Sequence, residues 1–317
     1  LGRHLHRRRT RRNGTRRRNS AIRTLHQRHP RERSSNRLQH LSVSHSIISL
    51  GLGLGGGKSA TSSGAPGGGG GGLIPGEQAV INLGPSFWVD ASYADAVKSD
   101  DSGSEATATN GQDVSKWISR AGTGIELVQA TASKQPIFNS SELDFGGYST
   151  ITFNSAAATD LLKDARYVDT VANVGTIFYV GKELNGDTNA RIINWSTNST
   201  SNLGTNYGAA DFFVYTPLVT YGSTGSQLNA YMASISLNGA SSYFSINEDT
   251  NVTFAASSDM TADIGDTAVG GTTGGSAEHA STQAAEYIIF NTALSPTNVA
   301  LVETYLKNKY KGGGSFG

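Results

Sequence analysis

The hydrophobic residues after position 86 come in short runs that are separated by Gly, Asn, Asp, Ser and Thr. The runs are β-branched and aromatic, and they recur at intervals typical of strands in antiparallel all-β sandwiches and barrels. They occupy residues 87–89, 125–128, 137–138, 151–153, 176–180, 191–195, 212–215, 231–237, 243–246, 252–254 and 286–290. We therefore expect one antiparallel β-sandwich over residues 79–311, long enough to bury a large core.

The segment after the last run has a helical pattern instead. Ser295 suits an N-cap and Pro296 the first helical position. Val299, Val302 and Leu306 fall on one face at helical spacing. Lys307, Lys309 and Lys311 lie where cations favour the C-terminal end of the helix dipole, and Gly312–Gly314 end the helix. The pattern predicts one short C-terminal helix on the sandwich, followed by a flexible tail over residues 312–317.

The chain before residue 79 has no such pattern. Residues 1–46 are rich in Arg and His and contain no aromatic residue, so we expect a disordered arm. Residues 47–78 begin with an apolar stretch, IISLGLGL, and continue as a Gly-rich tether with the unbroken run Gly67–Gly72. The apolar stretch either pairs as a strand with another chain or belongs to the tether.

Charge divides the chain at the same place. Residues 1–45 carry a net charge of +13 and the remainder −12, although the whole chain carries only +1. Three interpretations of the arm stay open: an extension or cleaved segment absent from the mature protein, whose natural start is then near Ser46–Ile48; a solvated tail; or a genuine segment that binds nucleic acid or an acidic surface.

Composition excludes several classes of protein. The chain has no Cys, so we expect no disulfide and no thiolate site. No apolar run approaches ~18 residues, so we expect no membrane-spanning helix.

The order of several motifs resembles a known family. Near the start these are FWVDAS at 87–92, VSKW at 114–117, QPIF at 135–138 and ITFN at 151–154. Near the end they are AEYIIFNTALS at 285–295 and VETYLKNKY at 302–310. Together they resemble jelly-roll domains of the concanavalin A-like lectin/glucanase group, laminin-G-like branch. The sequence departs from that pattern after Trp117, where the usual Asp-containing turn is Ile118-Ser119-Arg120.

Jelly rolls behind such a tether resemble phage virion proteins. The resemblance implies a structural protein of capsid decoration, fibre or tail type, located on the virion surface and displaying the sandwich to stabilise the particle or adhere to glycans. Its partners are then other virion proteins, and we expect a homo-oligomer. The alternative is a carbohydrate-binding module of a secreted or cell-surface bacterial protein, and the third possibility is a glycoside hydrolase.

The sequence predicts that the chain is not an enzyme. Jelly-roll glucanases align their carboxylates on one strand, whereas here Glu142 and Asp144 are present and the third acid is missing. The sandwich contains a single His, His279, in a polar loop, and no nucleophile elbow accompanies it.

Two sets of residues are candidates for binding. Trp195 with Asn194, and Tyr207, lie in polar contexts where an aromatic ring could stack on a sugar; the alternative is that Trp195 belongs to the core. No cofactor is expected with certainty, but calcium is possible, because Ca²⁺ prefers oxygen ligands in acidic loops. Asp259, Asp263 and Asp266 are spaced within eight residues, and a second acidic loop spans Asp95–Asp101.

Overall fold

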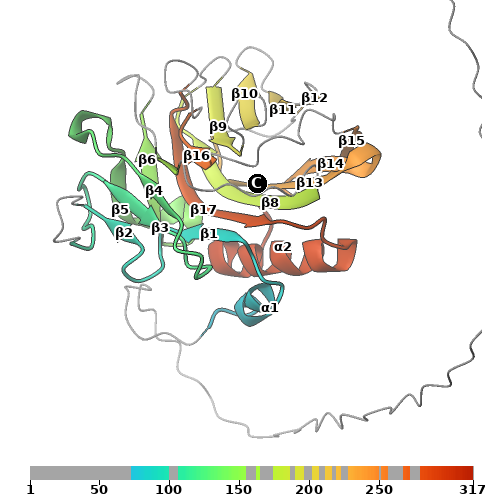
Figure 1. Cartoon of the computed structure of the whole chain (residues 1–317), viewed down its shortest axis with the longest axis horizontal. Helices are drawn as coiled ribbons and strands as arrows, with labels where there is room; N and C mark the ends of the chain where they lie inside the picture. The colour runs from blue at the N-terminus through green and yellow to red at the C-terminus, as the bar shows by residue number, and fades with distance from the viewer. Residues whose placement is uncertain are drawn as a thin grey trace, which may run out of the picture. The chain divides into compact units, whose positions relative to one another are not determined.

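The computed structural model describes residues 73–99, 106–154, 162–164, 174–185, 190–195, 202–206, 211–215, 219–222, 228–249, 251–255, 267–271 and 279–316. The predicted basic arm and most of the predicted tether lie outside these residues. The predicted antiparallel β-sandwich is confirmed, since two large sheets form the described part of the chain (Figure 1).

The first sheet has eight strands, and its central strands are the long hydrophobic runs of the sequence. Its order is β15-β14-β13-β8-β17-β6-β5, and β1 also pairs with β17. The strands are β1 (Phe87–Asp90), β5 (Ile137–Glu142), β6 (Tyr148–Phe153), β8 (Val174–Glu183), β13 (Tyr231–Asn238), β14 (Ser242–Ile246), β15 (Val252–Phe254) and β17 (Thr282–Phe290).

The second sheet has nine shorter strands in the order β12-β11-β10-β9-β16-β7-β4-β3-β2. They are β2 (Val97–Lys98), β3 (Lys116–Ile118), β4 (Glu126–Val128), β7 (Leu162–Asp164), β9 (Ala190–Asn194), β10 (Asn202–Asn206), β11 (Asp211–Tyr215), β12 (Val219–Gly222) and β16 (Thr267–Val269). In the part of the chain that the structure describes, 3₁₀ turns at Ala132–Lys134, Leu143–Phe145 and Gly239–Ser241 lie between strands.

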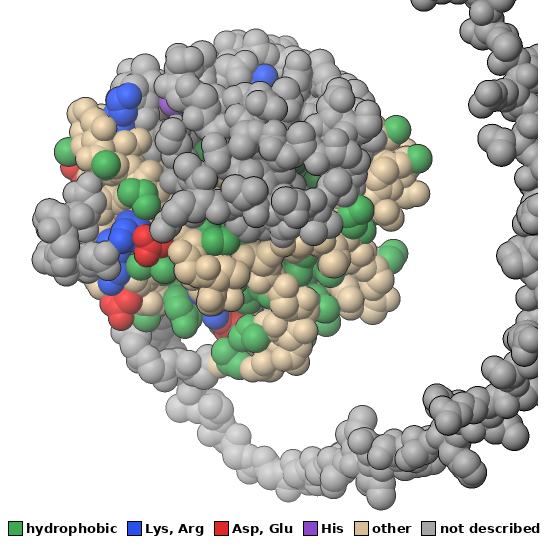
Figure 2. All heavy atoms as spheres, viewed as in Figure 1, with side chains coloured by type: hydrophobic (Ala, Val, Ile, Leu, Met, Phe, Trp, Pro, Cys, Tyr) green, Lys and Arg blue, Asp and Glu red, His purple; other side chains and the backbone are tan. Residues whose placement is uncertain are grey.

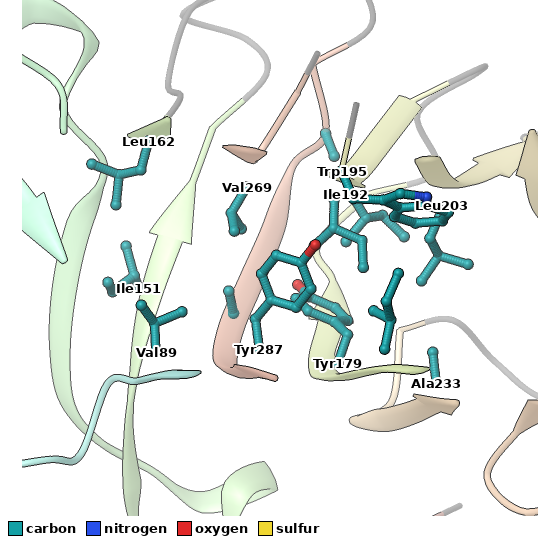
Figure 3. Close-up of a cluster of buried hydrophobic side chains, with 14 of the residues drawn as sticks. Val89, Ile151, Leu162, Tyr179, Ile192, Trp195, Leu203, Ala233, Val269 and Tyr287 are labelled. Carbon is teal, nitrogen blue, oxygen red and sulfur yellow. The ribbon is translucent and has the colours of Figure 1, made fainter. Parts of the chain in front are cut away.

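The first sheet is buried on both faces, because successive residues of a strand point to opposite sides. In β17, Tyr287 and Ile289 join the core between the sheets, where Figure 3 shows Tyr287. Ile288 and Phe290 join a second core under the helices. The two cores explain why the central strands are hydrophobic along their whole length, without the alternation of a half-exposed strand.

The predicted C-terminal helix is confirmed, with the predicted start and end. Helix α2 (Pro296–Lys311) has 16 residues, and Figure 1 shows it running beside β17 and β8. Ser295 Oγ accepts from Asn298 N at 3.3 Å, and Gly312 ends the helix with φ 59°. The predicted inner face, Val299, Val302 and Leu306, is buried.

The sequence did not predict helix α1 (Glu77–Asn82), which contacts α2. It begins inside the segment assigned to the tether, and Val80 joins the second core. Phe316, in the segment predicted to be a flexible tail, is also buried in that core. Among the described residues, no helix has the length and hydropathy needed to cross a membrane.

Buried ion pairs connect α2 to the first sheet. Lys309 Nζ lies 2.6 Å from Asp90 Oδ2 in β1 and 2.7 Å from Glu286 Oε2 in β17. Burial opposes the charged ammonium, but the two carboxylates outweigh it and raise the pKa of Lys309. Burial also raises the pKa of Glu286, against the opposing effect of Lys309. Lys309 therefore lies in the last turn of α2, as the sequence predicts, but its side chain is buried in the core.

Glu286 is also saturated with hydrogen-bond donors. Its Oε1 accepts from Trp88 Nε1 at 2.6 Å and from Tyr305 Oη at 3.0 Å, and its Oε2 accepts from Tyr310 Oη at 2.7 Å. We call Glu77, Asp90, Arg120, Glu286 and Lys309 the buried charge network.

Candidate functional site

The structure places two of the predicted sugar-binding residues in the core. Trp195 is 1% exposed and Asn194 is 0% exposed, at the end of a strand in which every residue is buried. Figure 3 shows Trp195 among the hydrophobic side chains between the sheets. A sugar has no access to these side chains here, so the core role is the correct interpretation of Trp195. Tyr207 lies outside the described residues.

The predicted calcium ligands Asp259, Asp263 and Asp266 also lie outside the described residues. In the described part of the chain, no group of three or more His, Asp or Glu side chains is arranged to hold a metal ion. Calcium binding therefore stays a prediction.

The described surface contains a cleft beside the loop that follows β1. It has a volume of about 350 Å³, within the range of small-molecule sites. We call it the Tyr93 cleft, and its lining residues are Ala91, Ser92, Tyr93, Ala94, Asp95, Val97, Thr107, Ala108, Phe138, Ser140, Ser141, Gly147 and Ser149.

Local hydrogen bonds shape the loop that carries Tyr93. Asp90 Oδ1 accepts from Ser92 N at 2.9 Å, the side-chain turn that Asp favours after a strand. Tyr93 N donates to Asp90 O, and Ala96 N donates to Tyr93 O, both at 3.1 Å. Asp95 has φ 62°, a left-handed conformation that Asp tolerates better than most residues. The loop therefore turns tightly enough to present its side chains to the cleft.

Hydroxyl groups and one carboxylate supply the polar chemistry of the cleft. Thr107 Oγ1 donates to Asp95 Oδ1 at 2.6 Å. Ser92 Oγ accepts from Ser149 N at 2.7 Å, and Ser149 Oγ donates to Ser140 O at 3.0 Å. These bonds join the Tyr93 loop to the β5–β6 hairpin, so the polar groups on both sides of the cleft are held in fixed positions.

Among the aromatic residues whose side chains the structure describes, Tyr93 is the one that is exposed, with 46% of its surface accessible. One face of its ring is covered by Arg120, whose guanidinium carbon lies 4.1 Å from the ring centroid. The three Trp side chains are at most 1% exposed. An aromatic surface for a ligand is therefore available at Tyr93 and not at any tryptophan.

A second cleft lies between the β14–β15 hairpin and helix α2. It has a volume of about 530 Å³, and we call it the Glu303 cleft. Its lining residues are Tyr243, Ser245, Glu248, Asp249, Asn251, Pro296, Val299 and Glu303. Burial raises the pKa of Glu303, the hydrogen bond from Ser234 opposes that effect, and the nearby Glu248 adds to it.

The tip of the β14–β15 hairpin is strained. Asn247 and Glu248 have φ 55° and 61°, and Asp249 N closes the turn on Ile246 O at 2.9 Å. Glu in the second left-handed position is unusual, since Gly is preferred there. Glu248 also pairs with Lys307 at 2.7 Å, so the hairpin and α2 are joined across the cleft.

The carboxylates of the glucanase-like segment lie elsewhere. Glu142 ends β5, and Asp144 follows in a surface turn, where Lys182 lowers its pKa through a hydrogen bond. Asp144 is therefore held ionised and cannot serve as a general acid near neutral pH. His279, predicted to be a solvated loop residue, is half-buried instead, and burial lowers its pKa.

Charges on the visible surface are mixed. Figure 2 shows basic and acidic side chains next to one another at the end of the molecule that contains β2 and β3. Lys116 and Glu126 form such a pair at 3.3 Å. The described surface in this view shows no continuous basic patch of the kind that binds nucleic acid.

Comparisons with known proteins identify no family. No family model and no curated protein matches the sequence. Domain 4 of AbnA, a GH43 extracellular arabinanase from Geobacillus stearothermophilus, has 12% identity and a TM-score of 0.43, over 68% of this chain and 97% of that one. An arabinofuranosidase complexed with arabinofuranosyl-α-1,2-xylobiose has 10% identity and a TM-score of 0.47, over 65% and 52%. Trypanosoma rangeli sialidase has 12% identity and a TM-score of 0.41, over 73% and 37%.

These structures are β-folds of proteins that act on or bind carbohydrates according to their descriptions. At such identities the likeness concerns the fold, and this chain spans about half or less of the arabinofuranosidase and the sialidase. The prediction that the chain is not an enzyme is overturned: glycoside hydrolases are among the solved structures that it resembles. A sandwich of this kind does not by itself exclude catalysis.

Proposed function

We propose that the sandwich binds carbohydrate through the Tyr93 cleft. The observation that carries this proposal is the exposed ring of Tyr93 beside fixed hydroxyl and carboxylate groups in one concavity. The C–H face of a sugar packs on an aromatic ring, while its hydroxyls exchange hydrogen bonds with side-chain oxygens. A hydrogen bond to a carboxylate oxygen, such as those of Asp95, is stronger than one between neutral groups.

The ligand is a neutral saccharide. Among the described residues that line the cleft, Asp95 is the one ionisable acid and none is Lys or Arg. A uronate, sialate or sulfate group would approach a carboxylate without a cation beside it to offset the repulsion. Arg120 is not available for that purpose, because it lies against the ring of Tyr93 and pairs with buried carboxylates.

Titration calorimetry against a panel of oligosaccharides tests the proposal. The neutral members are arabinotriose, xylotriose and maltotriose, and the anionic member is 3′-sialyllactose. We expect at least one neutral trisaccharide to bind, and Tyr93→Ala to weaken that binding about tenfold, which corresponds to ~1.4 kcal/mol.

The matched control is Tyr243→Ala, which removes an aromatic ring from the Glu303 cleft and leaves the Tyr93 cleft intact. Loss of binding in Tyr243→Ala with unchanged binding in Tyr93→Ala would move the site to the other cleft. Binding of 3′-sialyllactose alone would contradict the neutral ligand.

A second candidate activity is glycoside hydrolysis in the Glu303 cleft. The raised pKa of Glu303 favours this activity, since glycosidases pair a protonated carboxylic acid with a second carboxylate. Release of reducing sugar from the same oligosaccharides measures it. Glu303→Gln should abolish any release, and release that persists in that variant would exclude Glu303 as the acid.

We further propose a setting for the module, which the resemblance of the sequence to phage virion proteins supports. The sandwich is displayed on the surface of a phage-like particle as a homo-oligomer, in contact with other virion proteins through the Gly-rich tether. Mass spectrometry of purified particles should detect the chain at high copy number. Its absence from the particles would favour a module of a secreted or cell-surface protein.

A further inference from the structure

Arg120 connects the core to the exposed ring of the Tyr93 cleft. Its guanidinium carbon lies 4.2 Å from the ring centroid of Trp88 and 4.1 Å from that of Tyr93. Trp88 is 1% exposed and Tyr93 is 46% exposed. One planar cation is therefore stacked between a buried ring and an exposed ring.

Two buried carboxylates fix the orientation of this cation. Nη1 of Arg120 lies 3.0 Å from Asp90 Oδ2, and Nη2 pairs with Glu77 Oε1. The backbone of Arg120 is also held, since its N donates to Trp88 O at 2.7 Å. Burial lowers the pKa of the guanidinium, but Asp90 and Glu77 outweigh burial and raise it. The cation stays charged, and both edges of its plane are occupied.

Asp90 links this arrangement to the loop of the cleft. Its Oδ2 receives Arg120 and also Lys309 of helix α2, while its Oδ1 accepts from Ser92 N. The same carboxylate thus orients the cation beneath Tyr93 and forms the turn that carries Tyr93. Movement of the Tyr93 ring relative to the sheet would disturb the carboxylate of Asp90, which Arg120, Lys309 and Ser92 N hold in place.

We propose that Arg120 is a positioning residue of the carbohydrate site, which rests on the function proposed above. It covers one face of the Tyr93 ring and holds the ring so that the opposite face is open to a sugar. A ring held in its binding orientation has less conformational freedom to lose when the ligand arrives, which favours affinity. The guanidinium also replaces water on the covered face, so a ligand meets the ring from one side only.

The experiment is a double-mutant cycle on xylotriose and maltotriose binding. Arg120→Lys keeps the charge but loses the flat surface that stacks on two rings. We expect it to weaken binding about tenfold in the wild-type background, and to have no further effect in Tyr93→Ala, because residues that act as one unit are not additive. Glu77→Gln, which only loosens the clamp on Arg120, should weaken binding two- to threefold and likewise lose its effect in Tyr93→Ala.

Two controls separate positioning from general loss of stability. Ser295→Ala removes the N-cap of α2 at a distance from the cleft, so it should lower the melting temperature without changing the dissociation constant. Aromatic ¹³C relaxation of Tyr93 in the free protein gives a readout that needs no ligand. The ring should be rigid in the wild type and mobile in Arg120→Lys.

The outcomes distinguish the two proposals. If Tyr93→Ala weakens binding but Arg120→Lys acts equally in both backgrounds, or not at all, the cleft binds sugar and the positioning role is wrong. If Tyr93→Ala leaves binding unchanged, the Tyr93 cleft is not the site and the positioning role fails with it. A ring that is equally mobile in the wild type and in Arg120→Lys overturns the positioning role even if neither sugar binds.

Discussion

The buried charge network and the Tyr93 cleft contain the same kinds of side chain in different roles. In the network, Lys309 meets two carboxylates, and these residues are at most 3% exposed. In the cleft, the carboxylate of Asp95 meets a hydroxyl group at the surface. A buried charge has to face an opposite charge, which locks both in place. A carboxylate that faces hydroxyls at the surface can exchange them for those of a ligand. Asp90 connects the two regions. Its Oδ2 pairs with Arg120 and Lys309 in the network, and its Oδ1 accepts from Ser92 N in the loop that lines the cleft.

The largest effect that tests this contrast is on stability. Lys309→Met leaves Asp90 and Glu286 buried without their shared cation, so we expect the free energy of unfolding to fall by about 3–5 kcal/mol. Urea denaturation followed by circular dichroism measures it. Lys307→Met on the same helix is the matched control, because Lys307 pairs with Glu248 at the surface, and it should cost about 1 kcal/mol or less. Equal losses in the two variants would contradict the distinction between buried and exposed pairs.

Alkaline pH should also act on the network. Burial and neighbouring carboxylates raise the pKa values of Tyr305 and Tyr310 well above 10.0, and the pKa of Lys309 is raised above 10.5. A raised folded pKa gives stability that is complete below the unfolded pKa and is lost as the pH rises through the folded pKa. The free energy of unfolding should therefore decrease above about pH 10, by up to ~1.4 kcal/mol per pH unit for each group.

Unfolding curves between pH 7 and pH 11.5 check this, with tyrosinate absorbance as a second signal. Tyr305→Phe provides the control, since it removes one of the three groups and should flatten the decrease. A stability that stays constant up to pH 11.5 would show that these groups titrate as they do in the unfolded chain.

The sequence predicts the strands and the helix that carry the two regions, but not the side-chain contacts within them. Runs of β-branched and aromatic residues identify the central strands, and Ser295, Pro296 and Gly312 mark the ends of α2, because these signals are local. Strands of three residues such as β7 and β16 are too short for a period of two to be visible. Helix α1 has only six residues, and its position depends on contact with α2.

The candidate binding residues and the buried ion pairs could be predicted from the sequence even less well than the strands and helices. Trp195 lies in a polar stretch of sequence, but it follows β9 of the second sheet and joins the core between the two sheets, and only the tertiary fold reveals that. Lys309 pairs with Asp90, more than two hundred residues away, which no local pattern indicates. One signal for the cleft was present, namely a Tyr in the loop directly after β1. The acidic stretch from Asp95 predicts a metal-binding loop, and that prediction does not involve Tyr93.

A medium effect is expected on the affinity of the Tyr93 cleft for sugar, which tests the role of the cleft in the comparison. Tyr93→Phe keeps the ring and its stacking on Arg120, so we expect the dissociation constant for xylotriose or maltotriose to change about threefold or less. Tyr93→Ala should weaken binding about tenfold, while the free energy of unfolding falls by about 1 kcal/mol or less, because the ring is half exposed. A large loss of stability in Tyr93→Ala would assign the ring to the framework, with the network.

The smallest effect gives the most direct comparison, because the same chemical change is made at Asp90, the last residue of β1, and at Asp95 in the loop that follows. Asp95→Asn retains an oxygen that accepts from Thr107. Asn also tolerates the left-handed φ of 62° at this position. The free energy of unfolding should therefore change by about 0.5 kcal/mol or less. Asp90→Asn removes the charge that faces Arg120 and Lys309, and it should cost about 3 kcal/mol.

Affinity should separate this pair of variants as well. Loss of the Asp95 charge weakens hydrogen bonds from sugar hydroxyls, so binding should fall several-fold in a variant of unchanged stability. Calorimetry beside thermal unfolding measures both quantities on the same samples. If Asp95→Asn lowered stability as much as Asp90→Asn, the carboxylate in the cleft would be a structural group, and the difference between a charge that faces a charge and one that faces a ligand would not hold in this loop.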